Sequence, residues 1–282
     1  VKGMGTKETD IVSDLLITTT HHDILFFTNR GRAFVLKAYE IPESGRQAKG
    51  TAIVNLLAVE SDERITAVIQ IKEFRADRFL FLATKRGVVK KTPLAEFANI
   101  RKSGLRAVNL DEDDELIGVK FTDGENRIML GTRHGKAIAF PEDGVRSMGR
   151  VTRGVRGINL SDGDEVVAMD ILKQDSEVLT VTEGGYGKRT TAEEYRTQTR
   201  GGKGLINMKV TDKTGPVVGI RVVRENQELM LITTDGIVIR TTVDEISLIS
   251  RNTQGVKLMT LGESDRVASM ATMNRIVDAP SE

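Results

Sequence analysis

The chain has 282 residues, 39% of them hydrophobic, so it is long enough to bury a substantial core. It has no cysteine, which excludes disulfides, thiol nucleophiles and cysteine-ligated metals and is compatible with a reducing cytoplasm, and no apolar run approaches the roughly 20 residues of a membrane-spanning helix. Its 41 basic and 40 acidic residues leave a net charge of +1, which excludes a uniformly basic coat, so the placement of charge along the chain matters most.

A β-hairpin recurs along the chain from Asp23 onward, after an initial segment, residues 1–22, of different character. Each copy has an apolar run, a turn that contains glycine, and a second alternating run, which together are typical of a hairpin. The expected first strands and turns are Ile24–Phe27 with Gly31, Phe79–Leu82 with Gly87, Ile128–Leu130 with Gly135, Val178–Val181 with Gly187, and Leu229–Ile232 with Gly236. By this alignment the fourth turn is two residues longer than the others.

The second half of each unit begins with a basic loop that ends in glycine. We use this glycine as an origin: apolar residues follow it at offsets 1, 4 and 6, a pattern that predicts a further strand, and an acidic turn lies near offset 10. The origin glycines are Gly50, Gly104, Gly154, Gly204 and Gly255. A period near fifty residues indicates a propeller or another array of supersecondary units.

The repeat predicts an all-β fold of about four strands per unit in one domain, residues 1–274. We expect full repeats at about 23–74, 75–124, 125–174, 175–225 and 226–274, followed by a frayed tail, 275–282. The register of Asp10 places a further origin glycine just before Val1, so residues 1–22 form a half repeat that closes the ring as a sixth blade. We expect an Arg- and Lys-rich segment ending in glycine upstream of Val1.

Charge follows the repeat, because every loop around an origin glycine carries only positive side chains. Equivalent positions of a radial array fall on one circle, so these loops predict a basic belt, while the acidic turns gather elsewhere. A belt of cations around a rigid disc suits a polyanion wrapped on its rim, although any single loop is also explained as a solvated turn. The candidate DNA-binding residues are Arg46, Lys49, Arg101, Lys102, Arg106, Arg146, Arg150, Arg153, Arg156, Arg196, Arg200, Lys203, Arg251 and Lys257.

One loop stands out for its composition, with two cations and three glycines. Glycine permits positive φ and close backbone approach, so N–H groups and cations can meet a phosphate together. Its residues are Gln198, Thr199, Arg200, Gly201, Gly202, Lys203 and Gly204.

The hairpin cations either extend the belt or protect exposed strand ends from edge pairing. They are Arg30, Arg32, Lys85, Arg86, Lys90, Lys91, Lys136, Lys188 and Arg189. We interpret Tyr39 and Tyr195, which follow two hairpins, as packing residues. Catalysis has little support, since the three histidines show no metal-ligand spacing and no nucleophile is paired with a base.

Several motifs closely resemble the C-terminal domain of the A subunit of bacterial DNA gyrase over essentially the whole chain. They are Gly31-Arg32, Glu40-Ile41-Pro42, Ile53-Val54-Asn55-Leu56-Leu57, Asp62-Glu63-Arg64-Ile65-Thr66, Gly185-Tyr186-Gly187-Lys188-Arg189-Thr190 and Asn252-Thr253-Gln254-Gly255-Val256. The resemblance implies a six-bladed β-pinwheel, a propeller-like disc whose blades exchange strands. It also implies a non-catalytic domain that wraps and bends duplex DNA around its perimeter and so enables negative supercoiling.

The family's hallmark is a box of sequence Gln-Arg-Arg-Gly-Gly-Lys-Gly, which Gln198–Gly204 matches except at Thr199. This copy lies in a late repeat, and the family's own box is expected to precede Val1. The resemblance further implies a cytoplasmic, ATP-dependent topoisomerase of two A and two B subunits, in which ATP, Mg²⁺ and the DNA-cleaving tyrosine act outside this domain. The alternatives are the equivalent domain of topoisomerase IV, for which the resemblance implies a pinwheel that wraps DNA only weakly, and a propeller that serves as a protein-interaction platform.

Overall fold

A threonine and a glycine close each hairpin turn in the computed structural model, which describes residues 18–45 and 50–274. The threonine hydroxyl is buried and accepts a hydrogen bond from the N–H four residues later: Arg32 donates to Thr28 at 3.3 Å and Val88 to Thr84 at 3.1 Å. The turn glycine adopts a positive φ of 74° to 84°, where side chains are strained. These glycines are Gly31, Gly87, Gly135, Gly185 and Gly236.

The fourth hairpin corrects the predicted turn. Its turn glycine is Gly185, with φ 79°, and the strand resumes at Tyr186, so this turn has the same length as the others. The prediction placed the turn at Gly187 and was wrong, because three glycines within four residues hide which of them takes the left-handed conformation.

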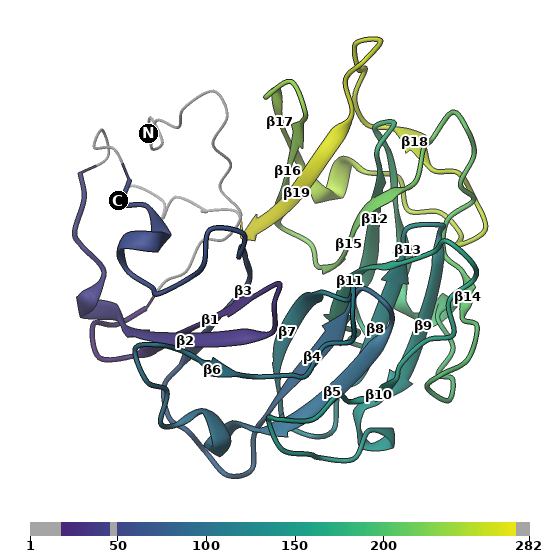
Figure 1. Ribbon diagram of the computed structural model, residues 1–282. Helices are drawn as coiled ribbons and strands as arrows, with labels where there is room; N and C mark the ends of the chain where they lie inside the picture. Colours follow the sequence, from purple (N-terminus) through teal and green to yellow (C-terminus); the bar gives the residue numbers. More distant parts are fainter. Residues whose placement is uncertain (1–17, 46–49, 275–282) are drawn as a thin grey trace, which may run out of the picture.

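Five antiparallel sheets, each one blade, surround a common centre (Figure 1). We number the blades in chain order and give their strands from the centre outward. Blade 1 contains β3 (Ile65–Ile71), β1 (Asp23–Thr28), β2 (Arg32–Lys37) and β6 (Leu105–Arg106). Blade 2 contains β7 (Leu116–Thr122), β4 (Phe79–Thr84), β5 (Val88–Pro93) and β10 (Val155–Arg156). Blade 3 contains β11 (Val166–Ile171), β8 (Arg127–Thr132), β9 (Lys136–Pro141) and β14 (Leu205–Ile206). Blade 4 contains β15 (Val217–Val223), β12 (Glu177–Thr182), β13 (Tyr186–Thr191) and β18 (Val256–Lys257). Blade 5 contains β19 (Val267–Asn274), β16 (Gln227–Thr233) and β17 (Val238–Thr242).

The outermost strand of each four-stranded blade comes from the following repeat. For example, β6 belongs to the second repeat but pairs with β2 of blade 1, where Leu105 lies opposite Ala33. This is the strand exchange that the sequence resemblance implied. Consecutive blades are therefore tied by backbone hydrogen bonds at their outer edges.

A single turn of 3₁₀ helix follows each hairpin, and one more turn lies after Gly50. They are η1 (Ala38–Glu40), η2 (Ile53–Asn55), η3 (Leu94–Phe97), η4 (Glu142–Gly144), η5 (Ala192–Glu194) and η6 (Val243–Glu245). The helix η2 occupies the place after Gly50 where the apolar pattern predicted a strand, so that prediction was wrong. Spacings of three residues fit a 3₁₀ turn as well as they fit an irregular strand, and the pattern alone does not separate the two.

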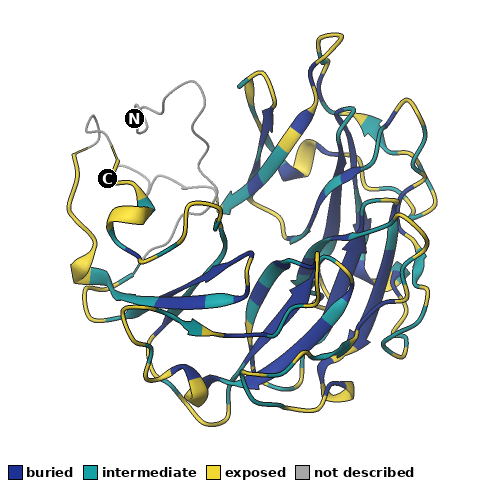
Figure 2. Ribbon diagram, viewed as in Figure 1, coloured by how far each residue is buried: buried dark blue, intermediate teal, exposed yellow. Residues whose placement is uncertain are grey.

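The core lies between blades rather than inside one layer. Leu25 and Phe27 of blade 1 pack with Leu80 and Leu82 of blade 2, and equivalent buried clusters separate the later blades. Figure 2 shows the buried residues concentrated on the strands and the exposed residues on the peripheral loops. Blade-to-blade contact is therefore what buries the apolar faces of each sheet.

The described residues contain five blades, and the fifth has three strands. Most of the predicted half repeat, at residues 1–17, lies outside the described part of the chain, as does the predicted tail, 275–282. Tyr39 is 62% exposed, so its predicted packing role was wrong, whereas Tyr195 is 1% exposed and does pack in the core. Within residues 18–45 and 50–274, no helix has the length and apolar character needed to cross a membrane.

Candidate nucleic-acid interface

The short outer strands place the basic loops on the outside edge of the disc. In β6, β10, β14 and β18 the second residue is exposed, and these residues are Arg106, Arg156, Ile206 and Lys257. Strand exchange thus puts a cation on the perimeter of blades 1, 2 and 4, with Ile206 as the exception on blade 3.

The exposed loop cations together form what we call the basic rim. Its members are Arg101, Lys102, Arg106, Arg146, Arg153, Arg156, Arg196, Lys203 and Lys257. All of them were among the candidates from the sequence. Arg46 and Lys49, the candidates of the first repeat, lie outside the described residues.

Three candidate arginines are only partly exposed, and they brace the loops. All three stand four residues before an origin glycine. The Arg200 side chain donates from Nε to the Gly144 carbonyl at 2.9 Å and from Nη1 to the Arg156 carbonyl at 3.1 Å. Arg251 donates to the Ile206 carbonyl at 2.6 Å, and Arg150 lies 3.9 Å from the Glu96 carboxylate. These side chains join one repeat to the next.

The box-like loop is held close to blades 2 and 3 by its backbone. The N–H of Gln198 donates to the Ala139 carbonyl at 2.8 Å, and the N–H of Gly201 donates to the Gly157 carbonyl at 2.6 Å. Gly201 and Gly204 have φ of 80° and 74°, so both use the freedom that only glycine has. Thr199 and Lys203 are exposed, which leaves one cation of this loop directed to solvent.

Some hairpin cations are not part of the surface at all. Lys90 is 1% exposed, Lys91 is 7% exposed and Lys188 is 0% exposed. Neither interpretation from the sequence, an extended belt or protection of exposed strand ends, fits these three. Each donates to at least one backbone carbonyl of the following repeat, which accounts for its inward direction.

The acidic turns lie beside the hairpin turns, where ion pairs join neighbouring blades. Arg64 pairs with Glu115 at 2.7 Å, Lys85 with Glu165 at 3.3 Å and Arg133 with Glu183 at 2.7 Å. These three ion pairs compensate acidic charge away from the basic rim. Among the described residues one ion pair joins the basic rim to an acidic turn, between Arg153 and Asp111 at 2.5 Å.

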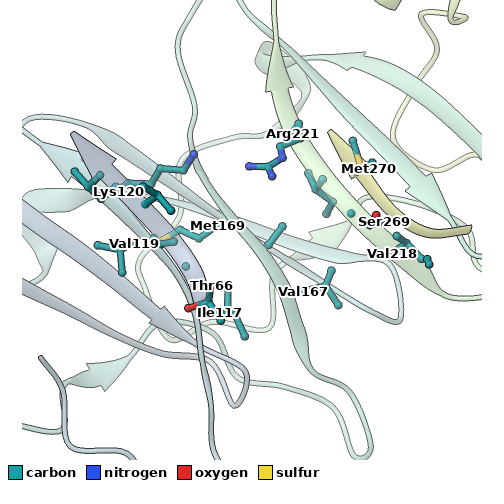
Figure 3. Close-up of a pocket in the computed structure, with 18 residues that line it drawn as sticks. Thr66, Ile117, Val119, Lys120, Val167, Met169, Val218, Arg221, Ser269 and Met270 are labelled. Atoms are coloured by element: carbon teal, nitrogen blue, oxygen red, sulfur yellow. The ribbon is translucent and has the colours of Figure 1, made fainter. Parts of the chain in front are cut away.

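The centre of the disc holds a cavity of about 290 Å³ between the inner strands of the blades. Figure 3 shows apolar side chains such as Val119, Met169 and Val218 around it, with the charged ends of Lys120 and Arg221 on one side. Its lining contains no histidine and no carboxylate among the described residues. Nor does the described part of the chain bring three or more potential metal ligands together.

The repeats match a known family. The family described as DNA gyrase C-terminal domain, beta-propeller, matches five consecutive stretches, residues 22–72, 78–123, 126–173, 176–224 and 227–272. The A subunit of DNA gyrase from Clostridium acetobutylicum is 53% identical over 275 residues, which cover 98% of this chain and 33% of that protein. The A subunit of DNA gyrase from Salmonella typhimurium is 46% identical, over 96% of this chain and 31% of that protein. The chain thus spans about a third of the length of these relatives.

Solved structures agree on the architecture. The C-terminal domain of DNA topoisomerase IV superposes with a TM-score of 0.88 at 28% identity, over 96% of this chain and 85% of that chain. The DNA gyrase A C-terminal domain superposes with a TM-score of 0.77 at 24% identity, over 96% of this chain and 92% of that chain, which shows the fold alone. The family match over all five blades, together with relatives that share about half of its residues, establishes that this chain belongs to the DNA gyrase C-terminal domain family of β-propellers.

Proposed function

We propose that this chain wraps and bends duplex DNA around its basic rim as the C-terminal domain of a gyrase A subunit. The observation that carries the proposal is the recurrence of exposed cations on the outer edges of blades 1, 2 and 4, at Arg106, Arg156 and Lys257. Cations that recur along a curved outer edge suit the phosphates of a bent duplex. Affinity from such contacts is largely independent of base sequence, because phosphates carry no sequence information.

Six blades remain our proposal for the closed ring. The outer edge of β17 has no strand partner among the described residues, whereas every other blade has a two-residue strand there. Val1-Lys2 aligns with Val155-Arg156, which forms such a strand on blade 2. By sequence register residues 1–22 correspond to the second half of a repeat, which is the part that a sixth blade requires.

The domain is proposed to act inside a larger enzyme. It has no proposed reaction of its own, and DNA cleavage, ATP hydrolysis and Mg²⁺ binding are assigned to the N-terminal part of the A polypeptide and to the B subunit. The partners are then duplex DNA and a bacterial cytoplasmic assembly of two A and two B subunits. The support is the 53% identity to a gyrase A subunit that is about three times as long.

The equivalent domain of topoisomerase IV is the second candidate, because its structure superposes with the higher TM-score. The TM-score depends on how the blades are arranged, whereas sequence identity also depends on the residues of the individual loops. The 46–53% identity to gyrase A subunits therefore favours gyrase. Wrapping distinguishes the candidates, since the resemblance implies only weak wrapping for the topoisomerase IV domain.

A salt titration tests DNA binding directly. If about ten cations neutralise phosphates, the logarithm of the association constant falls against the logarithm of salt concentration with a slope of about −9. Fluorescence anisotropy with a labelled duplex at several salt concentrations measures this slope. A slope shallower than about −3 favours a protein-interaction platform instead.

A further inference from the structure

Two lysines with no role in the interface described so far occupy equivalent buried positions. Lys90 and Lys188 each lie three residues after a hairpin glycine, in blades 2 and 4. The other blades carry apolar residues there: Phe34, Ile138 and Ile239. Burying an ammonium costs free energy unless its surroundings supply hydrogen-bond acceptors. The presence of lysine in blades 2 and 4, where the other blades have an apolar residue, therefore needs a specific reason.

Both lysines donate to backbone carbonyls of the basic loop from the next repeat. The Lys188 ammonium donates to the Ser250 carbonyl at 2.8 Å, to the Arg251 carbonyl, and to the Thr253 hydroxyl at 3.1 Å. The Lys90 ammonium donates to the Arg150 carbonyl and, at 3.3 Å, to the Thr152 carbonyl. It also donates to the Ala107 carbonyl at 2.7 Å, which lies in the same repeat as Lys90.

A glutamate also binds each of these loops, by accepting a hydrogen bond from a backbone N–H. The Arg251 N–H donates to Glu194 at 2.9 Å, and the Arg150 N–H donates to Glu96 at 3.0 Å. Each loop is thus held from two sides: a lysine donates to its carbonyl oxygens, and a glutamate accepts a hydrogen bond from one of its backbone N–H groups. In blade 3 neither group is present, because Ile138 and Gly144 occupy the two positions.

We propose that Lys90 and Lys188 are positioning residues of the DNA interface, which fix the basic loops of the third and fifth repeats so that their cations face the duplex. The proposal rests on the proposed DNA-binding function. The inward turn of the Arg251 and Thr253 carbonyls directs the opposite, N–H ends of those two peptides toward the rim, where they favour an anion. The N–H groups of Asn252 and Gln254 have no partner in the described part of the protein, so they remain available to phosphate oxygens.

This arrangement couples DNA binding to protons. Burial lowers the pKa of Lys90 to about 8, with Glu96 raising it and Arg150 lowering it further. Burial likewise lowers the pKa of Lys188 to about 8, with Glu194 raising it and Arg251 lowering it further. Phosphates on the rim favour the charged form and raise both pKa values, so binding takes up protons near pH 8. Affinity therefore falls as the pH rises through 8, by about three- to tenfold for each lysine if the pKa rises by half a unit to one unit.

The test compares the wild-type chain with the Lys90→Met/Lys188→Met variant at constant ionic strength from pH 7 to 9.5. The wild type is expected to lose affinity for a labelled duplex across this range, whereas the double variant binds more weakly at pH 7 and shows a flatter profile. Lys257→Met is the matched charge control, since it removes a rim cation from the fifth repeat and leaves Lys188 in place. It should weaken binding at every pH and keep the wild-type profile. A double variant that retains the full wild-type decline overturns the proposal.

Amide hydrogen exchange in the absence of DNA tests whether the two lysines hold the loops, independently of whether the protein binds DNA. At one fixed pH, residues 250–254 and 148–152 should lose protection in the double variant, while the loop at 196–204, which rests on Ile138, keeps its protection. Unchanged exchange in the first two loops overturns the positioning role even if the wild type binds DNA. If the wild type binds no DNA, the proposed function fails, and loss of protection still supports the role of the lysines in holding these loops.

A measurement on the wild type alone covers the case in which the double variant does not fold. Calorimetric titration of DNA at pH 8 in two buffers with different ionisation enthalpies reports the protons taken up. Net uptake supports the proposal, and zero uptake contradicts it.

Discussion

Lys120 of β7 and Asp170 of β11 form an ion pair of 3.3 Å beside the central cavity, so a single carboxylate joins two blades. The second oxygen of Asp170 accepts the N–H of Val222 in β15 at 2.8 Å, which adds a third blade. Blades 2, 3 and 4 therefore meet at one side chain. Its removal leaves an ammonium and a backbone N–H without their acceptor.

The first prediction is that Asp170→Ala destabilises the disc. Loss of a partly buried acceptor costs about 1–3 kcal/mol, and Tm falls by roughly 2–4 °C per kcal/mol for a domain of this size. Thermal unfolding followed by circular dichroism measures the change. Asp212→Ala is the matched control, because Asp212 is exposed and forms no ion pair with any described residue. Equal Tm values for the two variants would mean that the Asp170 contacts contribute nothing.

The second prediction separates two cations of the box-like loop. Lys203 is exposed, so Lys203→Ala should weaken DNA binding while the free energy of unfolding stays within about 0.5 kcal/mol of wild type. Arg200→Ala should weaken binding and also destabilise the protein by about 1 kcal/mol for each lost hydrogen bond to Gly144 and Arg156. Fluorescence anisotropy measures the DNA affinity of both variants, and thermal unfolding measures their stability. A large fall in Tm for Lys203→Ala contradicts the assignment.

The third prediction concerns a glycine that ends this loop. Gly204 has φ 74°, and an added Cβ would lie 2.6 Å from the Ala137 carbonyl oxygen. Gly204→Ala should therefore cost at least the roughly 1–2 kcal/mol of a left-handed residue with a side chain. Gly144→Ala serves as the control, since its Cβ would meet nothing within 4 Å. Chemical denaturation of both variants tests the difference, and similar midpoints would show that this glycine is not required.

The fourth prediction is a rise in stability with pH between about 8 and 10. The pKa values of Lys90 and Lys188 are lowered to about 8 in the folded protein, so above that pH the unfolded chain binds more protons than the folded chain. The free energy of unfolding therefore increases with pH until the unfolded lysines also deprotonate, near their usual pKa of about 10.4. Denaturant titrations at several pH values measure the slope, which the Lys90→Met/Lys188→Met variant should lack.

Tyr195 acts in the opposite direction at higher pH. Burial raises the pKa of its hydroxyl, which donates to Asn207 at 2.5 Å. Above about pH 10 a tyrosine in the unfolded chain loses its proton while Tyr195 keeps it, so stability falls again. Tyr195→Phe should shift the decline to higher pH, and an unchanged decline would assign it to other groups.

The fifth prediction is that affinity grows with duplex length. A straight rod touches only neighbouring blades, and bending a 20–30 base-pair site by 40–90° costs on the order of 1–6 kcal/mol. Only a duplex that reaches several blades gains enough phosphate contacts to offset this cost. Affinity should level off once the rim is covered, and fluorophores at the two DNA ends should approach each other on binding. Binding without any shortening of the end-to-end distance is incompatible with a wrap.

The repeat could be predicted from the sequence because it depends on local chemistry. A threonine followed three residues later by glycine closes a hairpin in every repeat, and each of these contacts lies within one turn. The exposed cations were also predictable, since Arg106, Arg156 and Lys257 recur two residues after an origin glycine. These features require only neighbouring residues, so the sequence alone determined the all-β repeat and the positions of most rim charges.

The tertiary structure alone decided which cations face outward. Lys90 and Lys257 are the same residue type, yet one is 1% exposed beneath a loop of the next repeat and the other is exposed on an outer strand. That difference arises when the following repeat adds its short strand and its loop to the blade before it, more than fifty residues away in the chain. The cost of desolvating the Lys90 ammonium is offset only by carbonyls that strand exchange brings to it. Because those carbonyls come from a distant repeat, the residues around Lys90 in the sequence do not predict its burial.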